Sequence, residues 1–141
     1  MRISALFLTL GLAASSTGCL SSMILNGTIK STRKASAAFN SIGDYDLAKR
    51  AASTGLVQFE GYHELAPDNQ DALFLLLRSW MSYGYAFAED DYEAARDADD
   101  DDLADYHKAR ALMAYNRAIK YGTLLLNELA ETVVREIEIQ L

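Results

Sequence analysis

The 141-residue sequence contains one cysteine, one proline and two histidines. A single cysteine, Cys19, excludes a disulfide bond within the chain. The histidines, His63 and His107, fall on different predicted helices beside polar residues, and without converging partners they indicate neither a metal site nor acid–base chemistry. The sequence also lacks a glycine-rich phosphate loop and any serine, histidine and acid order typical of nucleophilic catalysis. We therefore expect no enzymatic activity, no metal and no cofactor.

Basic residues are also scarce. The chain has 13 Lys and Arg against 20 Asp and Glu, which gives a formal net charge of -7. No basic stripe is available to neutralise phosphates, which argues against nucleic-acid binding. Many of the acids lie between Asp97 and Asp105. A calcium loop starting at Asp97 would need glycine at its sixth position and glutamate at its twelfth, where the chain has Asp102 and Lys108. We expect a solvated acidic loop over residues 97–105 instead of a metal site.

The only strongly apolar run at the N-terminus covers residues 3–14, directly after the positive charge of Arg2. A run of this length is typical of a secretory signal peptide and is too short for a membrane span. The small residues of Ser15-Ser16-Thr17-Gly18 then precede Cys19, and this order resembles the bacterial lipobox. The resemblance implies a signal peptide over residues 1–18, cleavage before Cys19 and lipidation of Cys19. The alternative is an ordinary signal peptide with an incidental cysteine.

Residues 19–41 have no strong periodicity apart from a possible short helix over residues 23–29, so we expect a lipidated cysteine followed by a tether. Lys30, Arg33 and Lys34 form a small basic group near the anchor. They either contact anionic lipid head groups or are simply solvated. Leu20, and not an aspartate, follows Cys19, which on the enterobacterial rule favours the outer membrane.

The remaining residues, 42–141, predict one all-α domain of antiparallel helix hairpins. A first amphipathic helix starts near Asp44 and ends before Pro67, which disfavours helical geometry at Ala66. A second helix over residues 71–89 is apolar nearly all round, which is typical of a helix buried on several sides. We expect it to form the core between the helices before and after it.

A third helix is predicted over residues 104–129, and an apolar stripe continues from Ala130 to Leu141. An apolar stripe that runs to the chain end needs a partner. Either the protein forms a homo-oligomer, or the chain is shorter than its relatives.

Two segments resemble the second helix of a tetratricopeptide (TPR) repeat, in which an aromatic residue lies between two alanines. Ala111, Tyr115 and Ala118 match this pattern fully. The segment from Gly43 to Ala52 matches the entry to such a helix but has Ala52 in place of the aromatic residue. We therefore expect a degenerate TPR-like helical array.

The order of several short motifs resembles the T-component family of tripartite ATP-independent periplasmic (TRAP) transporters. The motifs are the lipobox, Asp44 to Ala51, Gly55-Leu56 with Glu60-Gly61, Ala66 to Asn69, Tyr83 to Phe87 and Ala109 to Gly122. The resemblance implies a lipid-anchored helical protein of the bacterial envelope that faces the periplasm. It also implies association with the transporter's solute-binding protein, homo-oligomerisation, and clefts for a small apolar ligand.

The chain contains eight tyrosines, and its aromatic residues cluster on the predicted helices. Aromatic residues at helical spacing usually pack in a core, but tyrosine also suits a surface that is dry in a complex and wet when free. We expect a partner or ligand surface to include some of five residues: Tyr62, Trp80, Tyr83, Tyr85 and Tyr115. The alternative function is a general TPR-like scaffold lipoprotein in envelope assembly.

Overall fold

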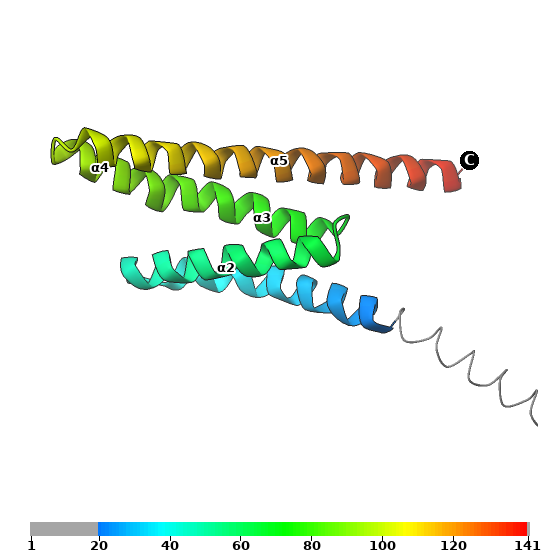
Figure 1. Ribbon diagram of the computed structural model, residues 1–141. Coiled ribbons are helices and arrows are strands. Elements are labelled where there is room, and N and C mark those ends of the chain that lie inside the picture. Colours follow the sequence, from blue (N-terminus) through cyan, green and yellow to red (C-terminus); the bar gives the residue numbers. More distant parts are fainter. Residues whose placement is uncertain (1–19, 141) are drawn as a thin grey trace, which may run out of the picture.

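The computed structural model describes residues 20–140, and every regular element in this range is a helix (Figure 1). The all-α prediction is confirmed. The predicted signal peptide and Cys19 lie outside the described residues. The elements are the N-terminal helix (residues 20–35), η1 (Ser36–Ser41), α2 (Tyr45–Leu65), α3 (Gln70–Tyr83), the π-helical turn η2 (Gly84–Ala88), α4 (Glu89–Asp97) and α5 (Asp101–Gln140).

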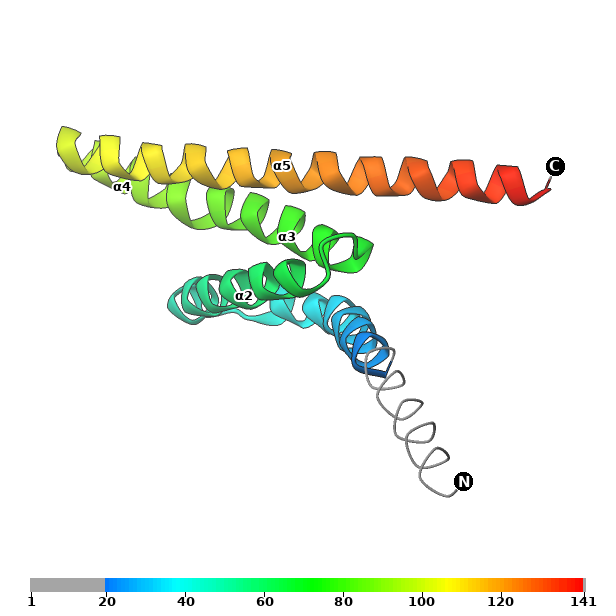
Figure 2. The same ribbon diagram turned by 45° about the vertical axis from the view of Figure 1, so that its right-hand side comes forward.

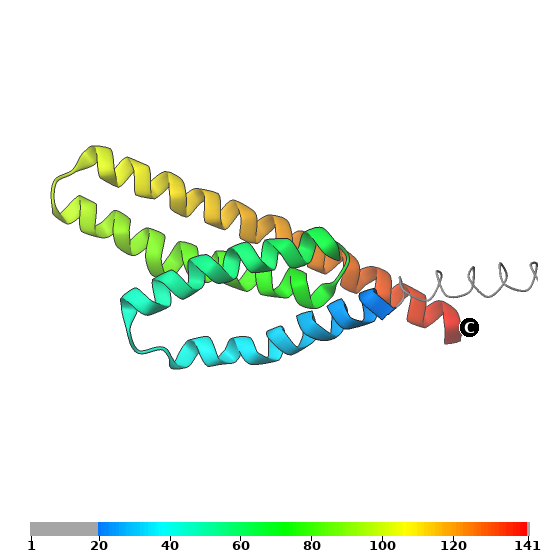
Figure 3. The same cartoon turned by 60° about the horizontal axis from the view of Figure 1, so that its bottom comes forward.

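The helices form two antiparallel hairpins that pack on each other (Figure 3). The N-terminal helix and α2 make the first hairpin. The second hairpin consists of the continuous rod α3–η2–α4 and the long helix α5. The first described turn of the N-terminal helix and the end of α5 lie at the same end of the molecule, and α5 projects beyond α3 there (Figure 2).

Polar caps set the starts of three helices. The side chains of Asp44, Asn69 and Asp100 accept hydrogen bonds from the backbone N–H groups three residues further on, at 2.6, 2.9 and 3.0 Å. Each cap satisfies a donor that the first helical turn leaves unpaired. Helix α2 ends at Leu65 because Pro67 forces Ala66 out of helical geometry, so the predicted corner is confirmed.

The core forms where α3 packs against α2 and α5. Leu73 and Leu76 of α3 are fully buried against Ala114 and Ala118 of α5, and Leu56 of α2 completes the contact. Burying one leucine side chain contributes about 1.5–3 kcal/mol. The prediction that this apolar helix forms the core between its neighbours is confirmed.

The expected acidic loop over residues 97–105 is wrong. Helix α4 continues to Asp97, only Ala98, Asp99 and Asp100 lie between the helices, and α5 starts at Asp101. Asp99 makes the turn with a positive φ of 56°, which aspartate tolerates better than most residues. Aspartates after the turn favour a helix start because their charge meets the positive end of the helix dipole.

The segment after Cys19 is also more ordered than the expected tether with a short helix. It is helical over residues 20–35, and Ile29 is fully buried against Ala72 and Leu75 of α3. Of the predicted basic group, Arg33 forms an ion pair with Asp71 and lies 4.1 Å over the Phe74 ring. Sequence periodicity missed this helix because only Leu25 and Ile29 point to the core, too few for an apolar stripe.

Candidate partner-binding groove

A groove of about 410 Å³ lies between α2 and α5, with α3 as its floor. Its lining is mostly apolar and aromatic, with one ion pair at the edge. The lining residues are Ser53, Leu56, Val57, Glu60, Trp80, Tyr83, Met113 and Arg117. Such a lining, with few polar groups that fix orientation, is typical of a binding surface.

Two aromatic rings form the floor of the groove. Trp80 and Tyr83 are one turn apart on α3, and their rings meet edge to face with centroids 6.2 Å apart. Val57 on the α2 wall is 76% exposed and Met113 on the α5 wall is 47% exposed. The groove therefore has accessible apolar walls above an aromatic floor.

Glu60 closes one end of the groove with a dense set of hydrogen bonds. Its carboxylate accepts from Trp80 Nε1–H at 2.8 Å, from Arg117 at 2.7 Å and from the Tyr121 hydroxyl. These bonds join α2, α3 and α5 through one side chain. Arg117 also lies 4.9 Å over the Trp80 ring and keeps its remaining N–H groups close to the groove.

The Glu60 cluster shifts the pKa values of its members. Burial alone raises the pKa of Glu60, but the hydrogen bonds from Tyr121, Trp80 and Arg117 outweigh burial and hold that pKa below its ordinary value. Burial and the hydrogen bond to Glu60 raise the pKa of Tyr121 to about 12. At neutral pH the cluster therefore holds a carboxylate and a neutral phenol.

Asp91 of α4 lies outside the groove lining but is linked to Tyr83 through Arg110. It pairs with Lys49 of α2 and with Arg110 of α5, the latter at 3.3 Å, and His107 Nδ1 lies 3.7 Å away. Arg110 also donates a hydrogen bond to the Tyr83 hydroxyl. The orientation of Tyr83 in the groove is thus fixed by a charged side chain that is itself held by Asp91.

The structure brings only two of the five predicted aromatic residues, Trp80 and Tyr83, into this groove. Tyr62 lies elsewhere, stacked on Phe59 and hydrogen-bonded to Gln58 at 2.8 Å.

The other two predicted residues lie near each other on another surface. Tyr85 is 72% exposed. Tyr115 packs beside Gly84 and hydrogen-bonds to Glu89; burial and that bond raise its pKa to about 12. Neither residue lines the groove.

Sequence reasoning missed the polar and aliphatic residues of the groove, notably Glu60, Val57, Met113 and Arg117. They form two pairs on facing helices, with spacings of three residues on α2 and four on α5, so each pair shares one helix face. That spacing was visible in the sequence. Only the packing of both helices on α3 shows that the two faces meet at one groove.

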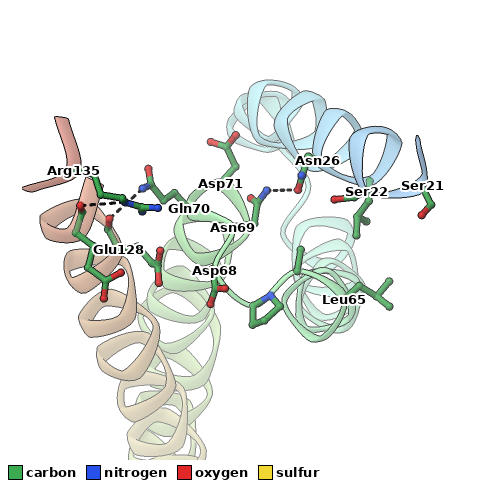
Figure 4. Close-up of a pocket in the computed structure, with 14 residues that line it drawn as sticks. Ser21, Ser22, Asn26, Leu65, Asp68, Asn69, Gln70, Asp71, Glu128 and Arg135 are labelled. Atoms are coloured by element: carbon green, nitrogen blue, oxygen red, sulfur yellow. Dashed lines mark hydrogen bonds between the residues drawn. The ribbon is translucent and has the colours of Figure 1, made fainter. Parts of the chain in front are cut away.

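A second, wider hollow of about 1280 Å³ lies between the N-terminal helix, the α2–α3 corner and α5 (Figure 4). Its lining is mainly polar, and several side chains bond across it, including Asn69 to Asn26 at 2.8 Å and Gln70 to Thr132 at 2.9 Å. These bonds link elements of the fold. The apolar groove on α3 is the better candidate for binding.

Within residues 20–140, no group of three or more His, Cys, Asp or Glu side chains is arranged to hold a metal ion. Nor does any helix there combine the length and apolar character needed to cross a bilayer.

The described residues form a helical domain in which two packed hairpins present a groove with an aromatic floor. A family model described as TRAP transporter T-component matches residues 43–140. The chain therefore belongs to the TRAP transporter T-component family, as the order of motifs indicated. The family is a transporter-accessory family and implies association with a TRAP transporter at the cell envelope. No curated protein and no solved structure matches the chain.

Proposed function

We propose that the protein is a periplasm-facing lipoprotein that serves a TRAP transporter by binding the transporter's solute-binding protein through the groove on α3. The observation that carries this proposal is the exposed groove with Trp80 and Tyr83 as its floor and Val57 and Met113 on its walls. Aromatic residues, methionine and arginine are enriched in protein–protein interfaces. A small apolar ligand is a second occupant of the same groove.

The arrangement of the hairpins supports a TPR-like array. The two segments that resemble the second helix of a TPR repeat are α2 and α5. Each is the second helix of its hairpin, so the motif and the position of the helix agree (Figure 3). A stack of hairpins presents an extended binding surface, which suits an accessory protein that recognises another protein.

Binding of the solute-binding protein is tested with two matched variants of α2. Val57→Asp places a charge on the groove wall, whereas Leu47→Asp places the same charge on an exposed position of α2 outside the groove lining. We expect Val57→Asp to weaken binding of the purified solute-binding protein at least tenfold and Leu47→Asp to leave it unchanged. Equal effects of the two variants would move the interface away from the groove.

Trp80 is the only tryptophan in the chain, so its fluorescence reports directly on the groove. Titration with the solute-binding protein is followed best with a receptor whose own tryptophans have been replaced. We expect a spectral shift that persists at high salt, because burial of apolar groups is not screened. If binding is lost at high salt and the fluorescence of Trp80 does not change, the contact lies on the acidic residues 97–105. If the protein binds no TRAP solute-binding protein, the alternative function as a general scaffold in envelope assembly is favoured.

Lipidation of Cys19 is a separate part of the proposal. The N-terminal helix is described from residue 20 and packs on α3, so a lipid on Cys19 would attach the domain closely to the membrane. Cells that express the full chain are labelled with a radioactive fatty acid and fractionated. The wild type should take up label and stay with the outer membrane, and Cys19→Ser should do neither. An unlabelled wild type would contradict lipidation.

We also propose that the protein forms a homo-oligomer. Large apolar side chains are exposed along α5, among them Ile119 (63%) and Leu126 (68%). Exposed apolar surface of this kind marks an interaction site in a soluble domain.

A further inference from the structure

The outward side of the N-terminal helix is apolar at its start and basic at its end. Leu20, Met23 and Ile24 are 57, 72 and 62% exposed. Lys30 and Lys34 follow on the same side of the helix and are also exposed. At about 100° per residue, these five side chains fall within an arc of about 120° around the helix. We call these five residues the outer face.

The outer face lies opposite the side of the helix that packs on the protein. Leu25 and Ile29 pack against α3 and lie about 160° around the helix from the middle of the outer face. Arg33, the third basic residue of the helix, pairs with Asp71 of α3 instead. In Figures 1 and 2 the N-terminal helix forms the lower edge of the fold and α5 forms the upper edge. The fold of the described residues therefore leaves the outer face uncovered.

The N-terminal helix differs in charge from the rest of the chain. Residues 20–43 contain three basic residues and no acidic residue, although the whole chain has a net charge of -7. Within residues 20–140, neither Lys30 nor Lys34 forms an ion pair. Two unpaired lysines beside exposed apolar side chains are complementary to a surface that is both anionic and apolar.

The sequence that precedes the helix indicates a lipid bilayer as this surface. Residues 3–14 form the apolar run, and Cys19, the expected lipidation site, comes directly before Leu20. Either feature would hold the first turn of the helix next to a bilayer. An amphipathic helix in a bilayer interface buries its apolar side chains at the boundary between head groups and acyl chains, while its lysines extend to the head groups. The outer face has this composition and this position in the chain.

We propose that the outer face docks on the anionic surface of a lipid bilayer, so that the N-terminal helix lies along the membrane. Leu20, Met23 and Ile24 enter the interface, and the two lysines contact lipid phosphates about 15 Å further along the helix. This deepens the membrane-anchor part of the proposed function, on which it rests. The contact orients the domain and does not replace the lipid as its anchor. No residue of this helix lines the groove on α3, so docking uses a different surface from partner binding.

The first experiment compares two labelled positions on the N-terminal helix, both of them exposed. Ser31→Cys lies within the arc of the outer face, about 18 Å along the helix from residue 19. Ser22→Cys is closer to residue 19 but lines the hollow on the other side of the helix. Lipidation blocks the thiol of Cys19, so only the introduced cysteine takes a fluorescent label. The purified full chain is reconstituted in vesicles of phosphatidylcholine and phosphatidylglycerol that carry a quencher on the lipid.

We expect the label at residue 31 to be quenched at least about twofold more strongly than the label at residue 22, because the thickness of the helix, about 10 Å, separates the two sides. A helix that only extends from its anchor gives the reverse order, since residue 22 is then nearer to the bilayer. That result would overturn the proposal. A label at residue 31 that is shielded from a water-soluble quencher but is not reached by the lipid quencher would show a protein partner, and it would overturn the proposal as well.

Fatty-acid labelling of Cys19 tests lipidation separately from docking. If the chain carries no lipid, the two labels are placed in the Cys19→Ser chain, in which the introduced cysteine is the only one, and vesicles are added in excess. The same order of quenching is expected there, and no quenching at residue 31 would overturn docking. A lipidated chain with the reverse order would retain the anchor and exclude docking of the outer face.

Aspartate variants test the apolar part of the outer face. Met23→Asp/Ile24→Asp should lower quenching of the Ser31→Cys label to the level at residue 22. Leu65→Asp, at a position at the end of α2 that is 71% exposed, should leave the quenching unchanged. The helical circular dichroism spectrum should not change in either variant, because all three residues are exposed. An equal loss of quenching with Leu65→Asp would move the contact from the outer face to the end of the molecule.

Charge reversal tests the basic part of the outer face. Lys30→Glu/Lys34→Glu should reduce quenching of the label at residue 31 on the same anionic vesicles, because glutamates are repelled by lipid phosphates. Lys108→Glu/Lys120→Glu changes the net charge equally at two exposed positions of α5 and should have no effect. Equal losses in the two double variants would assign the effect to net charge and contradict docking through the outer face. Quenching that no outer-face variant reduces would also overturn the proposal.

Discussion

Two faces of α5 carry apolar residues, but only one of them is covered by the rest of the chain. The face toward α3 buries Ala114, Ala118 and Tyr121, whereas Leu112, Ile119 and Leu126, about a quarter of a turn beyond Ala118 around the helix, are exposed. A helix in a soluble protein normally turns its large apolar residues to the core. The small residues are explained by the fold of one chain, since they let α3 and α5 approach closely. The fold of the described residues does not cover the three exposed apolar side chains.

The closeness of α3 and α5 is visible at two glycines. A Cβ atom added to Gly84 would lie 3.0 Å from Tyr115 Cε1 and 3.3 Å from Ala114 Cβ. A Cβ atom added to Gly122 would lie 3.3 Å from Leu77 Cδ1. A side chain at Gly84 would therefore be crowded, whereas one at Gly122 would require only a small shift of Leu77.

The largest expected effect comes from a charge placed inside this contact. Leu76→Asp buries an unpaired carboxylate where Leu76 is 0% exposed, and we expect it to destabilise the domain by more than about 4 kcal/mol, enough to unfold it. The matched variant Leu126→Asp, on the outer side of α5, should retain the fold. Circular dichroism and urea unfolding of both chains measure this difference. Loss of helix in Leu126→Asp alone would reverse the assignment of the two sides.

Overpacking tests the same comparison without a charge. Ala118→Leu inserts a large side chain between α3 and α5 and should cost about 1–3 kcal/mol of unfolding free energy. Asn116→Leu introduces the same residue at an exposed position of α5 and should change stability by less than about 0.5 kcal/mol. Urea titration of the two variants is sufficient. Similar losses of unfolding free energy in the two variants would show that Ala118 is not packed more tightly than Asn116.

Glu60 connects the inner side of α5 to α2, and its contribution depends on pH. Since the pKa of Glu60 is lowered in the folded protein, its stabilising effect is present above the ordinary value of 4.5 and is lost as pH falls below it. Glu60→Gln should cost about 1–3 kcal/mol at neutral pH and flatten the stability profile below pH 4.5. Thermal unfolding across this range measures both effects, with the exposed Glu64→Gln as the control that should match the wild type.

The smallest effect is expected at the start of α5. The Asp100 side chain accepts a hydrogen bond from Leu103 N–H at 3.0 Å, so Asp100→Ala should cost about 1 kcal/mol. Asp100→Asn keeps an equally good cap and should be nearly neutral. A loss with Asp100→Asn equal to that with Asp100→Ala would show that the charge, and not the cap, holds the start of this helix.

Much of the fold was accessible from local sequence features. Pro67 and Asn69 mark the corner between α2 and α3, and the unbroken apolar character after Asp71 marks the core helix, because both depend on residues close in sequence. The order of short motifs identified the family, which the match over residues 43–140 confirms. The acidic residues were misread because composition alone does not distinguish a solvated loop from a capped helix start, which depends on where Asp99 turns the chain.

Local sequence features predicted only part of the candidate site. Trp80 and Tyr83 were predicted as binding residues from their type, but Glu60, Met113 and Arg117 join them only because α2 and α5 pack on the same helix. The sequence by itself determined the corner at Pro67, the cap at Asn69 and the apolar helix at the centre, since these follow from periodicity and near neighbours. Tertiary structure alone decided which faces meet, because that depends on the close approach of α3 and α5 over their alanines and glycines.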